Sequence, residues 1–514
     1  MKFKTQIRKI SLNRIFITGI LILIQVVWFL FFFFHVINYS AYIGTALTIL
    51  SLPIMLYIVN KDINPSYKIS WLLLIATLPI LGGLLYVFFG GKRPAKAMAN
   101  KLRESQEVYL TPLSQDKEVF GSLEKENKRF STTCRYVCDT CGYPVYDGGL
   151  VQYFSLGDDM YPVLIEELKK AKHSIFLEFF IIANGIMWDS ILEILVEKAK
   201  SGVDVRIIYD DMGCVALLPK GYNKYLESLD PNIKCIVFNP VVPFFSVVMN
   251  NRDHRKIVVI DSSTAFNGGI NLSDEYINAE VKYGKWKDTG VMVKGPAVYS
   301  FTEMFLEMWN AFRKENDDIE NYRPEPADFT EKPAGYVLPL SDTPLDNEPL
   351  GEEVYLEIIN QAKDYVYILT PYLVIDDDMK SALTLAAKRG VDVRIVTPGI
   401  PDKKVIYRLT RANYVPLMCA GVRIFEYTPG FVHAKSYISD DKIGIVGTIN
   451  MDYRSLYLHF ECGTLMYDTP CLKDLKADSL SVMEDSHEIT LSNFKQYYKG
   501  TMFDAFLRVI APLL

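Results

Sequence analysis

Three long runs without Asp, Glu, Lys or Arg open the chain. They cover Ile15–Ile37, Ala41–Val59 and Ile69–Gly90. Each run is close to the ~20 apolar residues that a helix needs to cross a bilayer. The first run is too long to be the apolar part of a cleaved signal peptide. The pattern therefore predicts N-terminal transmembrane helices, two to three in number, that form a membrane anchor over residues 1–91.

Basic residues flank this predicted anchor on both sides. By the positive-inside rule each group places its own end of the anchor in the cytoplasm, which three full spans cannot satisfy. Pro79 and the pair Gly82-Gly83 would let the last run bend or re-enter the membrane. We expect a multi-pass protein of the cell membrane whose remaining chain is cytoplasmic. The basic groups are Lys2, Lys4, Arg8, Lys9 and Arg14, and Lys92, Arg93, Lys96, Lys101 and Arg103.

After a polar connector over residues 92–142, amphipathic segments alternate with short apolar ones. Apolar spacing of three and four predicts helices, and short runs rich in β-branched residues predict strands. This alternation is typical of a mostly parallel sheet with helices on both faces. The predicted elements are helix Tyr161–Lys172, strand Ser174–Ile182, helix Asp189–Ser201, strand Gly202–Ile208, helix Glu352–Asp364, strand Tyr365–Thr370, helix Asp377–Arg389 and strand Gly390–Val396.

The same order of elements occurs twice. The pentapeptide Gly-Val-Asp-Val-Arg begins at Gly202 and again at Gly390, 188 residues later. The Pro-rich segment Arg323–Leu350 separates the two copies and is interpreted as their connection. We expect two α/β lobes related by pseudo-twofold symmetry, over residues 143–325 and 326–514, with the active site in the crevice between them.

Composition narrows the classes of function. A net charge of −6 argues against a general nucleic-acid binder, while 50% hydrophobic residues and a mean hydropathy of +0.11 fit a membrane portion. The eight cysteines are scattered, unlike a disulfide framework. Cys134, Cys138 and Cys141 form one cluster, but without an obvious fourth ligand they are a weak zinc signal. Reduced thiols are the favoured interpretation.

Residues suited to chemistry also occur twice. The first copy consists of His254, Lys256, Asp261, Gly268 and Asn271. Each residue type recurs 179 positions later, and the second copy is His433, Lys435, Asp440, Gly447 and Asn450. Agreement at five positions excludes a chance His-x-Lys pair.

Each His-x-Lys pair suits phosphoryl transfer. On a strand, residues two apart point to the same face, so His254 projects with Lys256, and His433 with Lys435. A phosphodiester needs cationic groups around its oxygens, a nucleophile in line and an acid for the leaving oxygen. Two facing pairs supply all of these, and the Asn of each copy adds a donor. No metal or cofactor is therefore expected.

The pattern H-x-K-x4-D-x6-G-x2-N resembles the HKD signature of the phospholipase D superfamily. The similarity is greatest to bacterial cardiolipin synthases, through Asn251–Lys256, Gly268–Tyr276 and the apolar hairpin within Lys61–Gly90. The resemblance extends over nearly all of the chain from about Ala41 onward. It implies that two phosphatidylglycerol molecules in a lipid bilayer are condensed into cardiolipin and glycerol through a phosphohistidine.

The resemblance also implies roles for individual residues. His254 is expected to be the nucleophile and His433 the general acid and base. An acid after each motif would orient a histidine, so that Asp288 holds His254 and Glu461 holds His433. The alternative for each acid is an exposed position on a strand edge. The Asp of each motif would then serve to order the turn after its strand more than to take part in the chemistry.

Two features near the motifs are interpreted less specifically. His459 lies close to the second motif but has no place in the pattern, and we expect it, like His35, His173 and His487, to be structural or exposed. The apolar run Val241–Met249 is too short to span a bilayer. It is either a buried strand or a loop that touches the membrane where a lipid enters.

Two other functions stay open at this point. In the first, water replaces the lipid alcohol and the protein is a hydrolase, either a phospholipase D or a membrane-tethered nuclease. The HKD pattern alone does not separate hydrolysis from transfer. In the second, the protein is a membrane scaffold without activity. The intact His, Lys and Asn of both copies argue against this second function.

Overall fold

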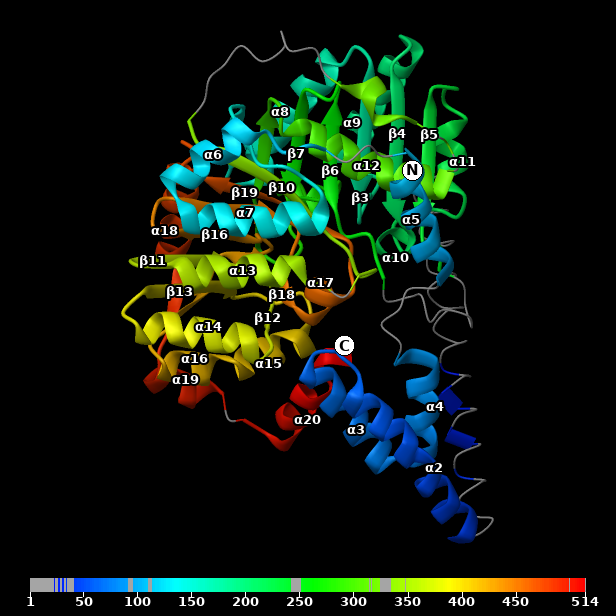
Figure 1. The fold of residues 1–514 in the computed structure, drawn as a ribbon, viewed down its shortest axis with the longest axis vertical. Coiled ribbons are helices and arrows are strands. Elements are labelled where there is room, and N and C mark those ends of the chain that lie inside the picture. The colour runs from blue at the N-terminus through cyan, green and yellow to red at the C-terminus, as the bar shows by residue number, and fades with distance from the viewer. Residues whose placement is uncertain are drawn as a thin grey trace.

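The computed structural model (Figure 1) describes residues 41–90, 96–109, 113–241, 251–313, 315, 317–323, 334–346, 348–498 and 500–513, with single positions between 23 and 34. Most of the predicted first apolar run, Ile15–Ile37, lies outside the described residues, as do its basic flank and His35. The run Val241–Met249 also lies outside them, except for Val241.

The N-terminal helices form a unit that stands away from the two sheets (Figure 1). Its members are α2 (Ala41–Asn60), α3 (Pro65–Thr77) and α4 (Pro79–Phe89). They enclose a small apolar core of Ile58, Trp71, Ile75 and Tyr86. The C-terminal helix α20 (Met502–Ile510) lies beside α3 and buries Leu507 against Tyr67 and Tyr453. The two ends of the described chain therefore meet in this unit.

The prediction of transmembrane helices is wrong for the described part of the chain, where no helix is both long and apolar enough to cross a membrane. The predicted run Ile69–Gly90 is divided between α3 and α4. Pro79 has no N–H and disfavours helical geometry at Leu78, where φ is −132° and ψ is 73°. Helices of 13 and 11 residues result. At 1.5 Å per residue they are roughly 16–20 Å long, short of the ~30 Å of a bilayer core.

Three helices occupy the predicted connector: α5 (Lys96–Tyr109), α6 (Lys117–Glu126) and α7 (Lys128–Cys141). The clustered cysteines Cys134, Cys138 and Cys141 lie on α7, at a spacing that places them on one helix face. All three are free thiols. Burial raises the pKa of Cys138 to about 11 and that of Cys141 to about 12, so both stay protonated at neutral pH. This fits the interpretation as reduced thiols.

The first lobe is built on a seven-stranded sheet. Its strands, in spatial order, are β2 (Leu150–Phe154), β9 (Gly290–Lys294), β7 (Thr264–Gly268), β6 (Lys256–Ile260), β3 (Ser174–Phe179), β4 (Asp204–Asp210) and β5 (Ile233–Phe238). Alternate residues of β3 enter different cores. Ile175 packs with α8 (Gly157–Lys170) and α9 (Ile186–Lys200), whereas Phe176 stacks on Phe305 of α12 (Val298–Arg313) at 4.7 Å between ring centroids.

The second lobe is built on a nine-stranded sheet. Its strands, in spatial order, are β1 (Tyr146–Asp147), β10 (Tyr336–Asp342), β19 (Glu461–Tyr467), β17 (Ile443–Gly447), β16 (Ser436–Ser439), β11 (Tyr365–Leu369), β13 (Asp392–Pro398), β14 (Arg423–Tyr427) and β20 (Ser486–Ile489). Helices α13 (Leu350–Gln361) and α14 (Asp377–Lys388) share one apolar core with this sheet, and α18 (Leu472–Glu484) contributes to the core of the other face.

Short elements complete the lobes. They are α10 (Asp211–Cys214), α11 (Tyr222–Glu227), β8 (Lys285–Lys287), β12 (Leu373–Val374), α15 (Lys404–Ala412), α16 (Tyr414–Cys419), β15 (Gly430–Val432), β18 (Met451–Asp452), α17 (Tyr453–Tyr457) and α19 (Leu491–Tyr497). One apolar core extends across both lobes, with Val259 and Val291 from the first sheet, Leu369 and Val446 from the second, and Trp309 of α12. The prediction of two α/β lobes is confirmed.

The prediction of mostly parallel sheets is wrong. The pairs β3–β4 and β4–β5 are parallel, as are β11–β13 and β13–β14, but the other pairs within the two large sheets are antiparallel. The reason lies in the length of the connections. β6 and β7 are separated only by residues 261–263, and so short a loop joins antiparallel strands. Each lobe therefore combines a parallel α/β half with an antiparallel half that carries the motif.

The Asp of each motif lies at the opposite end of its strand from the His. The Asp261 carboxylate accepts hydrogen bonds of 2.7–2.8 Å, and the Asp440 carboxylate accepts bonds of 2.8–2.9 Å. The donors are the backbone N–H groups of Lys172, His173 and Ser174 for the first, and of Lys363, Asp364 and Tyr365 for the second. Both acids therefore anchor the start of the neighbouring strand, β3 or β11, and lie away from the paired histidines.

We predict that Asp440→Ala lowers the thermal unfolding midpoint by an amount equivalent to about 1–3 kcal/mol, because three backbone donors lose a charged acceptor. Asp441→Ala is the matched control, since Asp440 and Asp441 both have left-handed backbones, with φ of 51° and 57°. Its side chain is 57% exposed and ion-paired with Lys476, so a smaller change is expected. Equal shifts in the two variants would mean that backbone strain alone accounts for the loss.

Candidate functional site

The residues of the two motifs are brought together by two short pairings between the lobes. β15 of the second lobe runs parallel to β8 of the first, with Val432 opposite Lys287. The N–H of His433 donates to the carbonyl of Lys287 at 2.7 Å. In the equivalent pairing, Asp253 lies opposite Phe460, and the N–H of His254 donates to the carbonyl of Phe460 at 2.9 Å. Each pairing aligns the histidine of one motif with the residue before the acid of the other.

Each histidine is therefore oriented by an acid from the other lobe. Nδ1 of His254 lies 2.9 Å from both carboxylate oxygens of Glu461. Nδ1 of His433 lies 2.6 Å from Oδ2 of Asp288. The expected assignment, Asp288 to His254 and Glu461 to His433, is wrong, although each acid does contact a motif histidine. The partners are exchanged because the strand before each acid pairs with the segment before the other motif's histidine.

The residue after the motif glycine differs between the copies for a structural reason. A Cβ at Gly269 would lie 2.1 Å from Oδ1 of Asp288, so only glycine leaves room for this carboxylate. The equivalent residue in the second lobe is Thr448, whose hydroxyl donates to Oε2 of Glu461 at 2.5 Å. In each lobe, this residue thus helps to hold in place the carboxylate that orients a histidine.

Both histidines line one cavity of about 650 Å³. Its lining includes apolar residues of one core cluster, Val374, Ile406, Leu409 and Ala511. It also includes the two histidines and further polar groups, among them Arg252, Asn271, Lys403, Asn450 and Arg454. A cavity of this kind fits an amphipathic ligand that has an anionic headgroup.

The motif lysines are buried behind the histidines. Lys256 is 2% exposed and Lys435 is 1% exposed. The ammonium of each donates to the carbonyl of its own motif's histidine, and Nζ of Lys435 also lies 2.9 Å from Nδ1 of His433. Burial lowers the pKa of Lys256 to about 8 and that of Lys435 to about 7. Their positive charge is thus sensitive to pH near neutrality.

Burial also keeps the histidines neutral. It lowers the pKa of His254 well below its ordinary value, with Lys256 as the next cause, and lowers that of His433 to about 4, with Lys435 as the next cause. Burial raises the pKa of Glu461, whereas the Lys256 ammonium lowers it. Glu461 receives the Thr448 hydroxyl and the Nδ1–H of His254, so we assign it as the acceptor. Nε2 of His254 then keeps its lone pair for reaction.

The two asparagines of the motifs border the cavity but are held differently. Oδ1 of Asn271 accepts from the N–H of Ile181 at 3.0 Å, and its Nδ2 donates to the Tyr276 hydroxyl at 2.7 Å. Oδ1 of Asn450 has no hydrogen-bond partner among the residues that the structure describes. Asn271 therefore helps to shape the wall, and Asn450 has an acceptor free for a bound hydroxyl.

The structure adds His459 to the site, where the sequence led us to expect a structural or exposed residue. Its ring centroid lies 5.5 Å from that of His254, and its Nδ1 lies 3.6 Å from Oε1 of Glu461. His254, His459 and Glu461 offer ligand atoms within 4.8 Å of one another, a set that can hold a metal ion. Catalysis without a metal therefore stays a prediction. The signal in the sequence was the spacing of His459 and Glu461, two apart like each His-x-Lys pair.

Two family models match the chain. The model described as "Cardiolipin synthase, PLD-like domain", where PLD stands for phospholipase D, matches residues 164–309 and 355–480. These ranges contain both motifs, both orienting acids and His459. The model described as "Phospholipase_D-nuclease N-terminal" matches residues 47–91, which correspond to most of the helical unit.

Relatives match over most of the chain. A cardiolipin synthase of Alkalihalophilus pseudofirmus is 32% identical over 472 residues, which are 91% of this chain and 92% of that protein. Cardiolipin synthase 2 of Bacillus anthracis is 32% identical over 454 residues, 88% of this chain and 87% of that protein. An uncharacterized protein of Streptococcus mutans is 46% identical over 465 residues, 90% of this chain and 99% of that protein.

A solved structure shares the fold. The phosphatidylserine synthase of Haemophilus influenzae superposes with a TM-score of 0.54 at 15% identity, over 74% of this chain and 96% of that one. This likeness supports the two-lobed architecture alone. The duplicated motif, the family model and the relatives identify the family itself. The chain belongs to the cardiolipin synthase family of phospholipase D-like proteins.

Proposed function

We propose that this protein is a cardiolipin synthase that transfers a phosphatidyl group from one phosphatidylglycerol to the headgroup hydroxyl of another. The observation that carries the proposal is the pair of crossed His–carboxylate contacts at one cavity, in a chain of the cardiolipin synthase family. Two differently surrounded histidines suit a reaction that needs a nucleophile and a proton carrier at the same phosphate.

In the first step, Nε2 of His254 attacks the phosphorus and the bond from phosphorus to the glycerol oxygen breaks. A phosphohistidine forms, and His433 gives its Nε2 proton to the leaving oxygen, so that glycerol departs neutral. The bound phosphate favours the protonated form of His433, because an opposite charge close by raises a histidine pKa. Lys256 and Lys435 offset the negative charge that develops on the phosphate oxygens.

In the second step, the headgroup hydroxyl of another phosphatidylglycerol attacks the phosphohistidine. Neutral His433 accepts the hydroxyl proton, the phosphorus–nitrogen bond breaks, and the electron pair returns to His254. The products are cardiolipin and an enzyme ready for another cycle. Water in place of the lipid alcohol would give phosphatidic acid, so the outcome depends on which hydroxyl reaches the cavity.

The substrate places the protein at a lipid surface. The helical unit exposes large apolar side chains, which suits contact with lipid. They are Ile49, Leu50, Leu52, Leu56, Tyr57, Val59, Ile69, Leu73 and Val87. We infer that this unit holds the catalytic cavity close to the bilayer that supplies phosphatidylglycerol. The cytoplasmic position predicted for the catalytic lobes stays a prediction.

We predict that the purified protein converts labelled phosphatidylglycerol in vesicles into labelled cardiolipin and free glycerol. His254→Ala should abolish the product, because the covalent intermediate cannot form. Thin-layer separation of the lipids identifies the product. Phosphatidic acid as the main product would contradict transfer and establish the hydrolase instead.

We predict that the two orienting acids affect formation of the phospho-enzyme in different ways. Glu461→Gln should slow formation of the phospho-enzyme by about 10²–10⁴-fold from any ester, because His254 loses its orientation. Asp288→Asn should slow it with phosphatidylglycerol but much less with an activated phosphatidyl ester, whose leaving group needs no proton. Labelling quenched with detergent at alkaline pH, which preserves the acid-labile phosphorus–nitrogen bond, measures the intermediate, and peptide mapping should locate it on His254.

His254→Ala and His433→Ala, which remove the oriented histidines themselves, are the reference variants for Glu461→Gln and Asp288→Asn. His433→Ala should still trap label from the activated ester, whereas His254→Ala should trap none. Label on His433 in the His254→Ala protein would exchange the roles of the two histidines. Absence of label in every variant would indicate direct displacement without a covalent step.

We predict that kcat/KM for phosphatidylglycerol falls as the pH rises through about 7 to 8, because Lys435 and Lys256 lose their protons in the free enzyme at these values. The decrease in kcat should occur at a higher pH than the decrease in kcat/KM, because the bound phosphate stabilises both ammonium groups. In Lys435→Arg, whose guanidinium stays charged, kcat/KM should fall less steeply with rising pH, relative to the value that this variant has at neutral pH. A kcat/KM that is constant up to pH ~9.5 would contradict this role of the lysines.

A further inference from the structure

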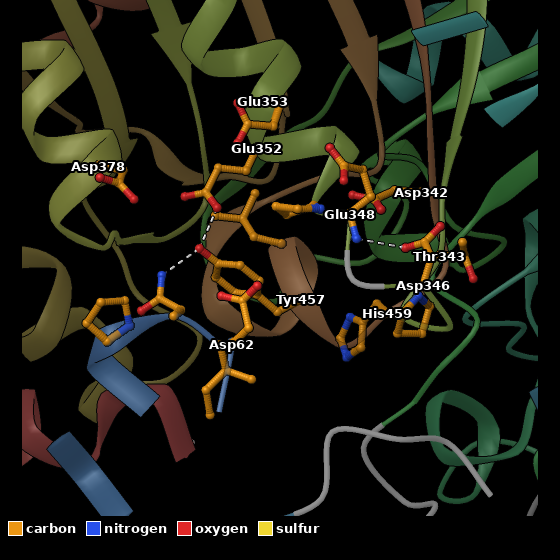
Figure 2. Close-up of a pocket in the computed structure, with 16 residues that line it drawn as sticks. Asp62, Asp342, Thr343, Asp346, Glu348, Glu352, Glu353, Asp378, Tyr457 and His459 are labelled. Atoms are coloured by element: carbon orange, nitrogen blue, oxygen red, sulfur yellow. Dashed lines mark hydrogen bonds between the residues drawn. The ribbon is translucent and has the colours of Figure 1, made fainter. Parts of the chain in front are cut away.

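A second cavity lies next to the catalytic one, and His459 borders both. It has a volume of about 230 Å³ and is lined by the link between α2 and α3, the turn between β10 and α13, the starts of α13 and α14, and the end of α17 with His459 (Figure 2). Its lining is rich in carboxylates. They belong to Asp62, Asp342, Asp346, Glu348, Glu352, Glu353 and Asp378.

The charge of this acidic cavity is unbalanced. Among the described residues that line it there is neither Lys nor Arg, and His459 is the one base. The carboxylates of this lining therefore lack, among the described residues that share it, the cations that ordinarily accompany buried acids.

Glu352 is one of the buried carboxylates that line this cavity. It is 3% exposed, and its Oε1 has no hydrogen-bond partner among the residues that the structure describes. Its Oε2 accepts from the Tyr457 hydroxyl, as Figure 2 shows. That hydroxyl also lies 2.9 Å from Oδ2 of Asp376, but it has one proton to donate. The two carboxylates thus share one phenolic proton, and Oε1 of Glu352, a residue that lines the cavity, is buried without a hydrogen-bond partner among the described residues.

We propose that the acidic cavity binds a hydrated divalent cation of the Mg²⁺ type, with Glu352 as a direct ligand. Carboxylates are hard oxygen donors of the kind that Mg²⁺ and Ca²⁺ select. Among the described residues, no three ligand atoms of this cavity converge as a preformed cage would require. This favours Mg²⁺, which keeps several of its waters and is held by one or two carboxylates. The remaining acids would bind the ion through those waters.

The position of the site suggests what the ion does. Asp62 belongs to the helical unit, Glu352 to α13 and Asp378 to α14. A bound cation would neutralise repulsion between these segments and fix the helical unit to the second lobe. His459 lies at the boundary, so the ion would also secure one wall of the catalytic cavity. The inference does not depend on the proposed reaction.

Calorimetric titration of MgCl₂ into the full-length protein, after treatment with a chelator, tests the site. We expect about one ion per chain and a rise of several degrees in the thermal unfolding midpoint at saturating Mg²⁺, because the ion binds the folded state alone. Glu352→Gln should weaken binding at least tenfold and remove most of this rise. Without Mg²⁺ the Glu352→Gln variant should be at least as stable as the wild type, because the substitution removes a buried acid that has no counter-ion.

Two further variants make the test specific. Asp62→Asn, at an exposed position in the link, should also weaken binding severalfold with no risk to the core. Asp377→Asn removes one charge from α14 outside the cavity, at a side chain that is 87% exposed, and should bind Mg²⁺ like the wild type. CaCl₂ titrated in parallel should bind at the same site but more weakly.

Three results would overturn the proposal. The first is the absence of binding heat together with an unchanged midpoint. The second is equal affinity in the wild type and in Glu352→Gln, which would place the ion elsewhere. The third is an equal rise in the midpoint with NaCl at matched ionic strength, which would reduce the effect to charge screening. None of these readouts requires catalysis, so failure of the cation site is distinguishable from failure of the proposed function.

Discussion

The active site depends on the parallel pairing between segments of different lobes. A histidine in a buried site is held in one tautomer only if its Nδ1–H meets a fixed acceptor. Neither lobe provides that acceptor for its own histidine: Glu461 serves His254, and Asp288 serves His433. Separation of the lobes would deprive each histidine of the carboxylate that receives its Nδ1–H. The chemistry and the packing of the lobes are thus stabilised by the same contacts.

The sequence was sufficient to single out the two histidines and two acids that the structure brings together, but not to pair them correctly. The repeat at constant offset identified both motifs with their asparagines, and the superfamily resemblance added the two acids. Neither could pair Asp288 and Glu461 with the correct histidine, because spacing along the chain is the same whether an acid turns toward its own lobe or the other. That choice is made by the pairing of β15 with β8, two short strands from different halves of the chain.

Other misassignments came from reading local patterns without their context. The apolar run Ile69–Gly90 has the composition of a span, yet Pro79 divides it into two helices. Alternating helices and strands suggested mostly parallel sheets, but the three-residue loop between β6 and β7 makes a hairpin. His459 was passed over because it lies outside the repeat, although it reaches the site through Glu461.

The crossed contacts also bear on how such a molecule could arise. Each lobe supplies one histidine to its own half of the cavity and one carboxylate to the other half, in a reciprocal exchange about the pseudo-twofold relation of the repeats. A chain with a single lobe would have a histidine without its acid, and an acid without its histidine. Two identical copies arranged about a true twofold axis would satisfy both at once. Fusion of two such copies would then free the halves to diverge, and the contrast between Gly269 and Thr448 is one visible product of that freedom.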